Sequence, residues 1–248
     1  MSRVVEEGDL FFFYRPRVDA DKVDELSDVQ RFFVVLKPDG DRRYRRIVIG
    51  RKRLPDPAEH ERVWAFVAEV TDEPDDLRDE LESKVYETRT RRVRVQPPAR
   101  PAGEGRYAIV EHDGHAHLAY VLELPREPGP AQEAFGIRRE ASYVVAVRNP
   151  TAGTPPGVGL SPRERADFPP ELLERFGRRR FVPLDDPRFL DYEGAELVLI
   201  GAAEDVESEL GIELDRDDER LQTADIFRQL RIRPGELPTE PLERGELR

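Results

Sequence analysis

The chain has 248 residues, and its 40 basic and 52 acidic side chains give a formal net charge of −12. It contains no cysteine, which excludes disulfides, thiolate metal sites and a cysteine nucleophile. Its uncharged apolar runs are too short to span a membrane, and its first residues lack the apolar stretch of a signal peptide. We therefore expect a soluble cytoplasmic protein with no membrane partner.

The first 150 residues have the pattern of a β-rich domain. Residues 9–14 and 31–36 are apolar blocks of strand length, and a Pro-Asp-Gly turn leads from the second block into a return strand at 43–49. Residues 62–70 form another expected strand, and a short helix follows it. Residues 86–95 alternate between valine and polar side chains, which predicts an exposed or edge strand.

A second hairpin is expected after a break in the pattern. Residues 97–105 are rich in proline and glycine and predict a loop or linker. The Asp-Gly dipeptide at 113–114 is a strong hairpin signal, and it joins expected strands at 106–112 and 115–124. A further strand is expected at 141–147.

The pattern changes beyond a proline- and glycine-rich loop at 149–161. Residues 161–164 have the form of a capping box, which marks the start of a helix. Three helices and two strands are expected from periodicity, the helices at 169–176, 204–210 and 218–230 and the strands at 181–184 and 196–200. The sequence thus predicts an α+β fold with a β-rich domain at 1–150, either a barrel or a twisted antiparallel sheet. A smaller mixed α/β region at 160–232 and a disordered tail at 233–248 follow it.

Three of the four histidines fall on the second expected hairpin. A two-residue turn pairs its strands so that His112, His115 and His117 share one face, opposite the face that carries the core residues. Three imidazoles on one sheet face can hold a zinc ion with a position left for water, which predicts a metal-dependent hydrolase. The alternative is a solvated hairpin tip whose polar residues are histidines.

Positive charge is concentrated in two segments of an otherwise acidic chain. Residues 42–53 carry seven basic side chains and residues 88–103 carry five, with no acid in either segment, so the rest of the chain sums to −24. Arginine forks bind phosphates and carboxylates bidentately. The candidate recognition residues are Arg43, Arg45, Arg46, Arg51, Lys52, Arg53, Arg89, Arg92 and Arg94. The alternative is that these arginines pair with acids of their own chain.

Charge segregation is the main functional signal of the sequence. No catalytic triad, phosphate loop or cofactor motif is recognised, and no pattern decides the oligomeric state. The sequence therefore predicts a non-catalytic binding or regulatory module with an arginine-rich surface for a charged macromolecular partner, protein or nucleic acid. One alternative is a nucleic-acid-associated protein using residues 42–53 and 89–100. The metal-dependent hydrolase is the other.

Overall fold

A computed structural model describes residues 2–20, 22–87, 93–153, 159–214, 220–221, 223–233 and 235–247. Its strands are β1 (Arg3–Pro16), β2 (Val29–Pro38), β3 (Tyr44–Ile49), β4 (Arg62–Thr71), β5 (Lys84–Glu87), β6 (Val93–Gln96), β7 (Arg100–His112), β8 (His115–Leu124), β9 (Glu140–Arg148), β10 (Phe181–Pro183) and β11 (Glu196–Ala203). Its α-helices are α1 (Arg78–Leu81), α2 (Pro130–Phe135), α3 (Pro170–Phe176), α4 (Val206–Leu210), α5 (Asp225–Gln229) and α6 (Glu240–Arg244).

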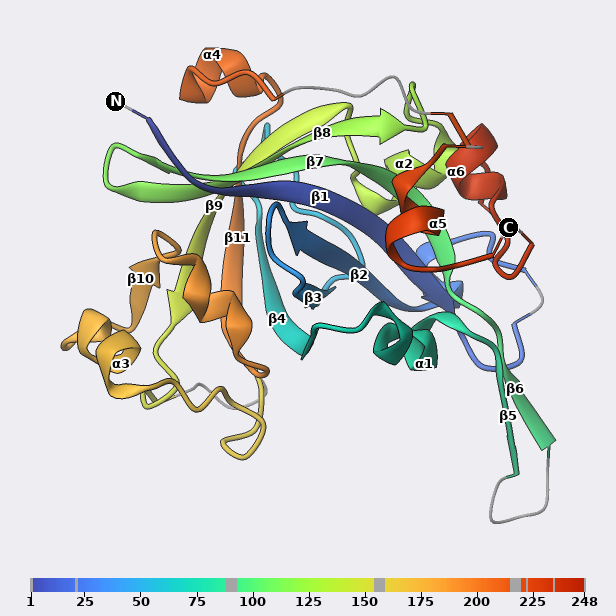
Figure 1. Ribbon diagram of the computed structural model, residues 1–248, viewed down its shortest axis with the longest axis horizontal. Coiled ribbons are helices and arrows are strands. Elements are labelled where there is room, and N and C mark those ends of the chain that lie inside the picture. The colour runs from blue at the N-terminus through green and yellow to red at the C-terminus, as the bar shows by residue number, and fades with distance from the viewer. Residues whose placement is uncertain are drawn as a thin grey trace.

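Most of the strands belong to one closed barrel. Over the described residues the main sheet has the order β10-β9-β11-β4-β3-β2-β1-β7-β8, and a further pairing of β8 with β9 closes it into eight antiparallel strands (Figure 1). β10 lies outside the barrel and pairs with the last residues of β9, from Ala146 to Arg148. This architecture confirms the predicted β-rich α+β fold. No helix in the described parts of the chain is long and apolar enough to cross a membrane.

The barrel is completed by a strand from late in the sequence. β11 lies between β4 and β9 and is antiparallel to both. On its other side β9 pairs first with β8 and then, further along, with β10. Strands on both sides of the domain boundary predicted near residue 150 therefore belong to the same sheet.

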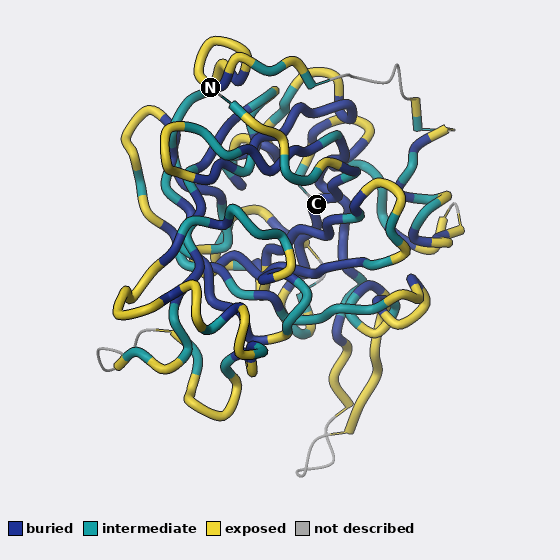
Figure 2. The backbone as a smooth tube through the Cα atoms, turned by 60° about the vertical axis from the view of Figure 1, so that its left-hand side comes forward, coloured by how far each residue is buried: buried dark blue, intermediate teal, exposed yellow. Residues whose placement is uncertain are grey.

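Two apolar cores lie on the two sides of the barrel wall. Along β1, Leu10, Phe12 and Tyr14 point into the barrel, whereas Phe11 and Phe13 point outward. The outer side chains are covered by α5, α6 and the short helices that precede β5, so the wall is buried on both faces there (Figures 1 and 2). Double burial explains why this strand is a continuous apolar run instead of an alternating one.

The predicted loop at 97–105 is wrong, because β7 begins at Arg100 and pairs with β1 and β8. Its glycines have a packing role in this strand. A Cβ added at Gly105 would lie 2.0 Å from the carbonyl oxygen of Val121, so only glycine allows the two backbones to approach this closely. The pairing register shifts beside it, between Glu104 and Gly105. Gly105, which the sequence pattern places in a loop, therefore lies at an irregularity within a strand.

Three other segments differ from expectation. The single strand predicted at 86–95 is wrong, since β5 and β6 pair with each other as an antiparallel hairpin. Residues 161–164 form a turn and not a helix start, although the backbone N–H of Ser161 donates to the Glu164 carboxylate as in a capping box. α6 lies in the segment expected to be disordered. It is anchored because Leu237 and Leu242 are buried in the outer core.

Candidate interaction site on a projecting hairpin

The first arginine segment is directed mainly at acids of its own chain. Arg45 is 2% exposed and donates to the carboxylates of Glu6 at 2.6 Å and Asp191 at 2.8 Å. Burial disfavours its charge, but these carboxylates outweigh that effect and raise the pKa of Arg45. Arg43 also pairs with Asp191, and the Tyr107 hydroxyl donates to Glu6. This network joins β1 and β3 to the segment around Asp191 and buries the guanidinium of Arg45.

The other candidates in this segment also have internal contacts. Arg46 is buried and pairs with Glu69 at 2.9 Å. Arg51 and Arg53 share the carboxylate of Glu61, at 2.5 and 2.8 Å. The Lys52 ammonium donates to a backbone carbonyl of β2. Residues 42–53 therefore fit the ion-pair alternative better than a recognition surface.

The second segment is divided between the core and the surface. Arg100 is buried, whereas the side chain of Arg94 is 47% exposed and pairs with Asp19 at 2.8 Å. Arg89 and Arg92 lie outside the described residues. Arg94 therefore keeps an exposed side chain, and it lies on β6, in the two-stranded hairpin that β6 forms with β5.

The three histidines share the outer face of the β7–β8 hairpin, where His117 is buried and His115 is exposed. The hairpin register pairs His112 with His115 and His117 with Val110, as the two-residue turn predicts. α4 covers one part of this face, where Leu210 belongs to one apolar cluster with Val110, whereas the hairpin tip at residues 113–115 is exposed. The cover comes from a segment far along the chain, which a local pattern does not show.

The histidine geometry gives no support to the hydrolase hypothesis. His117 is 3% exposed, and its burial lowers the pKa of its imidazole. The ring centroids of His112 and His117 are 6.0 Å apart, and Nδ1 of His112 lies 2.9 Å from the hydroxyl of Ser2. Among the described residues, no group of three or more histidine and carboxylate side chains is arranged to hold a metal ion.

β5 and β6 form a two-stranded arm that projects from the barrel (Figures 1 and 2). The register pairs Val85 with Val95 and Glu87 with Val93, so these four side chains share one face, which we call the valine face. The exposed fractions of Val85, Val93 and Val95 are 69, 62 and 42%. The arm thus carries three of the most exposed large apolar residues of the described chain.

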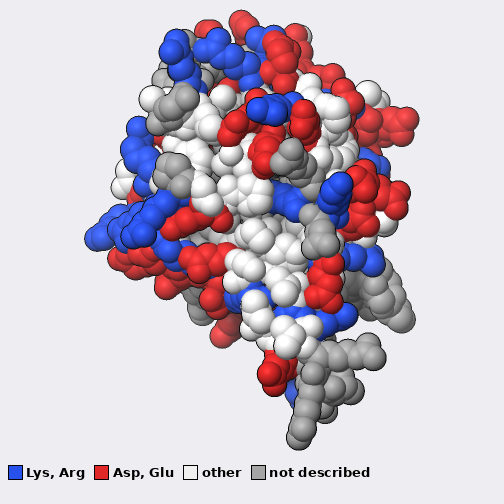
Figure 3. Space-filling view, turned by 90° about the vertical axis from the view of Figure 1, so that its right-hand side faces the viewer, with Lys and Arg blue, Asp and Glu red and all other residues white. Residues whose placement is uncertain are grey.

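The opposite face of the arm is basic and aromatic. Tyr86 pairs with Arg94, and Lys84 pairs with Gln96, so these side chains share what we call the basic face. The ring of Tyr86 is 45% exposed. From the sequence, residues 84–96 contain five basic residues and one acid, whereas the whole chain has a net charge of −12. Figure 3 views the side from which the arm projects, with acidic and basic groups intermixed over the body above it.

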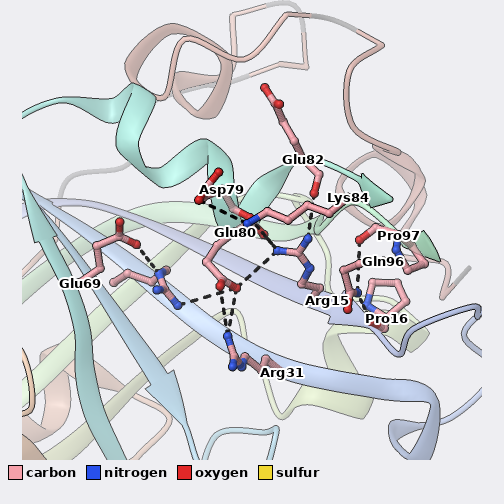
Figure 4. A network of polar contacts seen from close by, with 11 residues as sticks. Arg15, Pro16, Arg31, Glu69, Asp79, Glu80, Glu82, Lys84, Gln96 and Pro97 are labelled. Carbon is pink, nitrogen blue, oxygen red and sulfur yellow. Dashed lines mark hydrogen bonds and ion pairs between the residues drawn. The ribbon is translucent and has the colours of Figure 1, made fainter. Parts of the chain in front are cut away.

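A buried arginine fixes the first strand of the arm (Figure 4). The guanidinium of Arg15, at the end of β1, donates to three backbone carbonyls where α1 leads into β5. These belong to Asp79, Glu80 and Glu82, at 3.2, 2.6 and 2.8 Å. Arg15 is 4% exposed, so the contacts are shielded from water. They hold the end of α1 and hence the direction in which β5 leaves the body.

The second strand is fixed by a buried amide. The side chain of Gln96 donates to the backbone carbonyl of Pro16 at 2.8 Å. One residue earlier, Val95 exchanges contacts with Asp19, whose backbone N–H donates to the Val95 carbonyl at 2.8 Å. Both strands of the arm are therefore anchored at their base, to the end of β1 and the residues that follow it.

Glu80 connects this attachment to the body of the barrel. Its carboxylate lies 3.1 Å from Arg31, 3.4 Å from Arg15 and 4.0 Å from Arg46 (Figure 4). Arg46 in turn pairs with Glu69 on β4. The sequence indicates the arm only as an alternating segment. The long-range contacts that orient it join residues distant in the chain.

Comparison of the chain with protein-family models, curated proteins and solved structures finds no match.

Proposed function

We propose that the protein is a binding module that recognises a negatively charged macromolecule through the basic face of its arm. The observation that carries this proposal is the contrast between the two arginine segments. Within 42–53, Arg45 and Arg46 are buried against carboxylates of the body, and Arg42 and Arg51 are exposed on the body itself. Lys84 and Arg94 instead lie on a projecting hairpin, on the same face as the exposed ring of Tyr86. A projection anchored at its base presents its side chains to a partner at little further cost in conformational entropy.

The internal contacts of the basic face are of a kind that a polyanion replaces. Arg94 pairs with Asp19, and Lys84 lies 3.4 Å from Asp79, whose side chain is 88% exposed. Exposed ion pairs contribute between about 0 and 1 kcal/mol, so exchanging their acids for phosphates or other carboxylates costs little. Tyr86 adds an exposed ring beside the guanidinium, on which a base or another planar group can stack.

The test compares two double variants with the same change in charge. Lys84→Glu with Arg94→Glu reverses the basic face, and Arg3→Glu with Arg42→Glu reverses two exposed arginines of the body, whose side chains are 65 and 83% exposed. Retention is measured on columns of single-stranded DNA and of polyglutamate, at low and moderate salt. We expect wild type and the body variant to be retained on one column, and the arm variant to elute early.

The two columns separate the classes of partner. Retention on DNA alone assigns a nucleic acid, retention on polyglutamate alone assigns an acidic protein surface, and both should weaken as salt screens the charges. The proposal would be contradicted if the wild type were retained on neither column. So would equal losses for the arm and body variants.

A further inference from the structure

The valine face of the arm lacks a cover in the described structure. A two-stranded hairpin is marginal in water, and its stability usually depends on burying one face. Here the side chains of Val85, Val93 and Val95 remain between 42 and 69% exposed. The proposed polyanion would contact the opposite, basic face. The valine face therefore calls for a separate apolar partner.

The body of the same chain has an apolar hollow with charged side chains at its edge. The hollow has a volume of about 410 Å³ and lies on the outer surface of β3 and β4. Val48, Phe66, Ala68 and Leu160 form its apolar part. Arg31 also lines the hollow, and its side chain is 46% exposed. Two acids, Glu164 and Glu193, contribute negative charge to the lining.

The arm is complementary to this hollow in both apolarity and charge. On the valine face, Glu87 is an acid that suits Arg31 in the hollow. A chain's own arm is unsuited to its own hollow, because Arg15 and Gln96 fix it in a direction away from the body (Figure 1).

We propose that two copies of this chain form a dimer by exchanging arms, with the valine face of each arm docked on the β3–β4 hollow of its partner. Each copy supplies one arm and one hollow, so a two-fold axis satisfies both contacts at once and closes the assembly. Glu87 of each arm pairs with Arg31 of the other copy. The basic faces of both arms then remain available on the outside of the dimer.

The test reverses this ion pair in separate chains. Glu87→Arg places two positive charges together at each contact of its homodimer, and Arg31→Glu places two negative charges together. We expect each variant alone to dimerise about tenfold more weakly than wild type, or worse, by analytical ultracentrifugation. In an equimolar mixture the two variants should form a heterodimer of wild-type affinity, because each arm then meets a hollow of opposite charge.

Two controls keep the test independent of folding and of the proposed function. Val85→Ser with Val93→Ser removes exposed side chains that support no core, and it should also yield monomers. Arg42→Glu changes an exposed charge outside the contact and should leave dimerisation unchanged. A monomeric wild type, or failure of the mixture to associate, would overturn arm exchange. Neither result would affect retention of the wild type on the anionic columns, which tests the other face.

Discussion

His117 illustrates how a single side chain acquires its properties from a distant segment. It lies on β8 beneath α4, with Glu209 and the other two hairpin histidines as its charged or titratable neighbours. Burial is the largest influence on its pKa and lowers it below the ordinary value of 6.5. The folded state therefore favours the neutral imidazole more strongly than the unfolded chain does.

This difference predicts a loss of stability in mild acid. The contribution of His117 is complete above its unfolded pKa near 6.5 and is lost as the pH falls toward the lower folded pKa, because only the unfolded chain then binds the proton. The slope is at most about 1.4 kcal/mol per pH unit. Urea unfolding of wild type between pH 7.5 and about 5.5 should show it, and His117→Leu should reduce it. His115→Leu, at an exposed position, should retain the wild-type slope.

At the scale of elements, the arm depends on the end of β1. Arg15 satisfies carbonyls at the end of α1, and Gln96 satisfies the carbonyl of Pro16. The last carbonyls of a helix have no partner within it, so this guanidinium replaces the usual capping contacts. Hydrogen bonds therefore join β1, α1 and β6 at the base of the arm. The arm has no apolar core of its own in the described structure.

Replacing the guanidinium should loosen the arm before it damages the barrel. Arg15→Met removes the buried donor of three backbone carbonyls and should lower the free energy of unfolding by about 1–3 kcal/mol. Hydrogen exchange of the β5 amides should accelerate, while that of β1 and β2 changes little. Arg31→Met removes a half-exposed partner of the same Glu80 and should cost less than about 1 kcal/mol. Equal effects of the two changes would contradict a special role for Arg15.

The local sequence pattern predicts most strands. It does not predict where the strands bend or which segments pack on them. Apolar blocks predicted β1, β2 and β4, and the Asp113-Gly114 turn predicted the register of β7 and β8. The local pattern places Gly105 in a loop, because the role of this glycine depends on the close approach of β8. The two positive segments are evident in the sequence. The pairing of Arg45 with Glu6 and Asp191 is not, since these contacts join residues far apart in the chain.

At the scale of the whole molecule, the barrel is filled by its own side chains. The cavity at its centre measures about 30 Å³ and is lined by apolar and tyrosine residues, among them Phe12, Leu199 and Tyr143. That volume is close to that of a single water molecule and far below the several hundred Å³ of ordinary ligand pockets. The interior is therefore a packed apolar core.

Enlarging this cavity should turn the filled interior into a binding site for a small apolar molecule. Phe12→Ala should lower the free energy of unfolding by about 3–5 kcal/mol, measured in urea. Benzene should then raise the midpoint of thermal unfolding of the variant but not that of wild type. Phe12→Leu is a milder version if the alanine variant does not fold. Binding of a drug-sized apolar ligand inside the wild-type barrel would contradict this account.

The position of β11 has a consequence for the order of events during synthesis. β4 and β9 lie on either side of this strand, which ends at residue 203. The ribosome therefore releases β1 to β9 before β11 is available. Until then the barrel is open between β4 and β9, and each of these strands has an unpaired edge. Pairings between distant segments form slowly, and open edges favour aggregation until they are filled. We expect nascent chains that stop short of β11 to need chaperones, and completed chains to fold in a late, cooperative step.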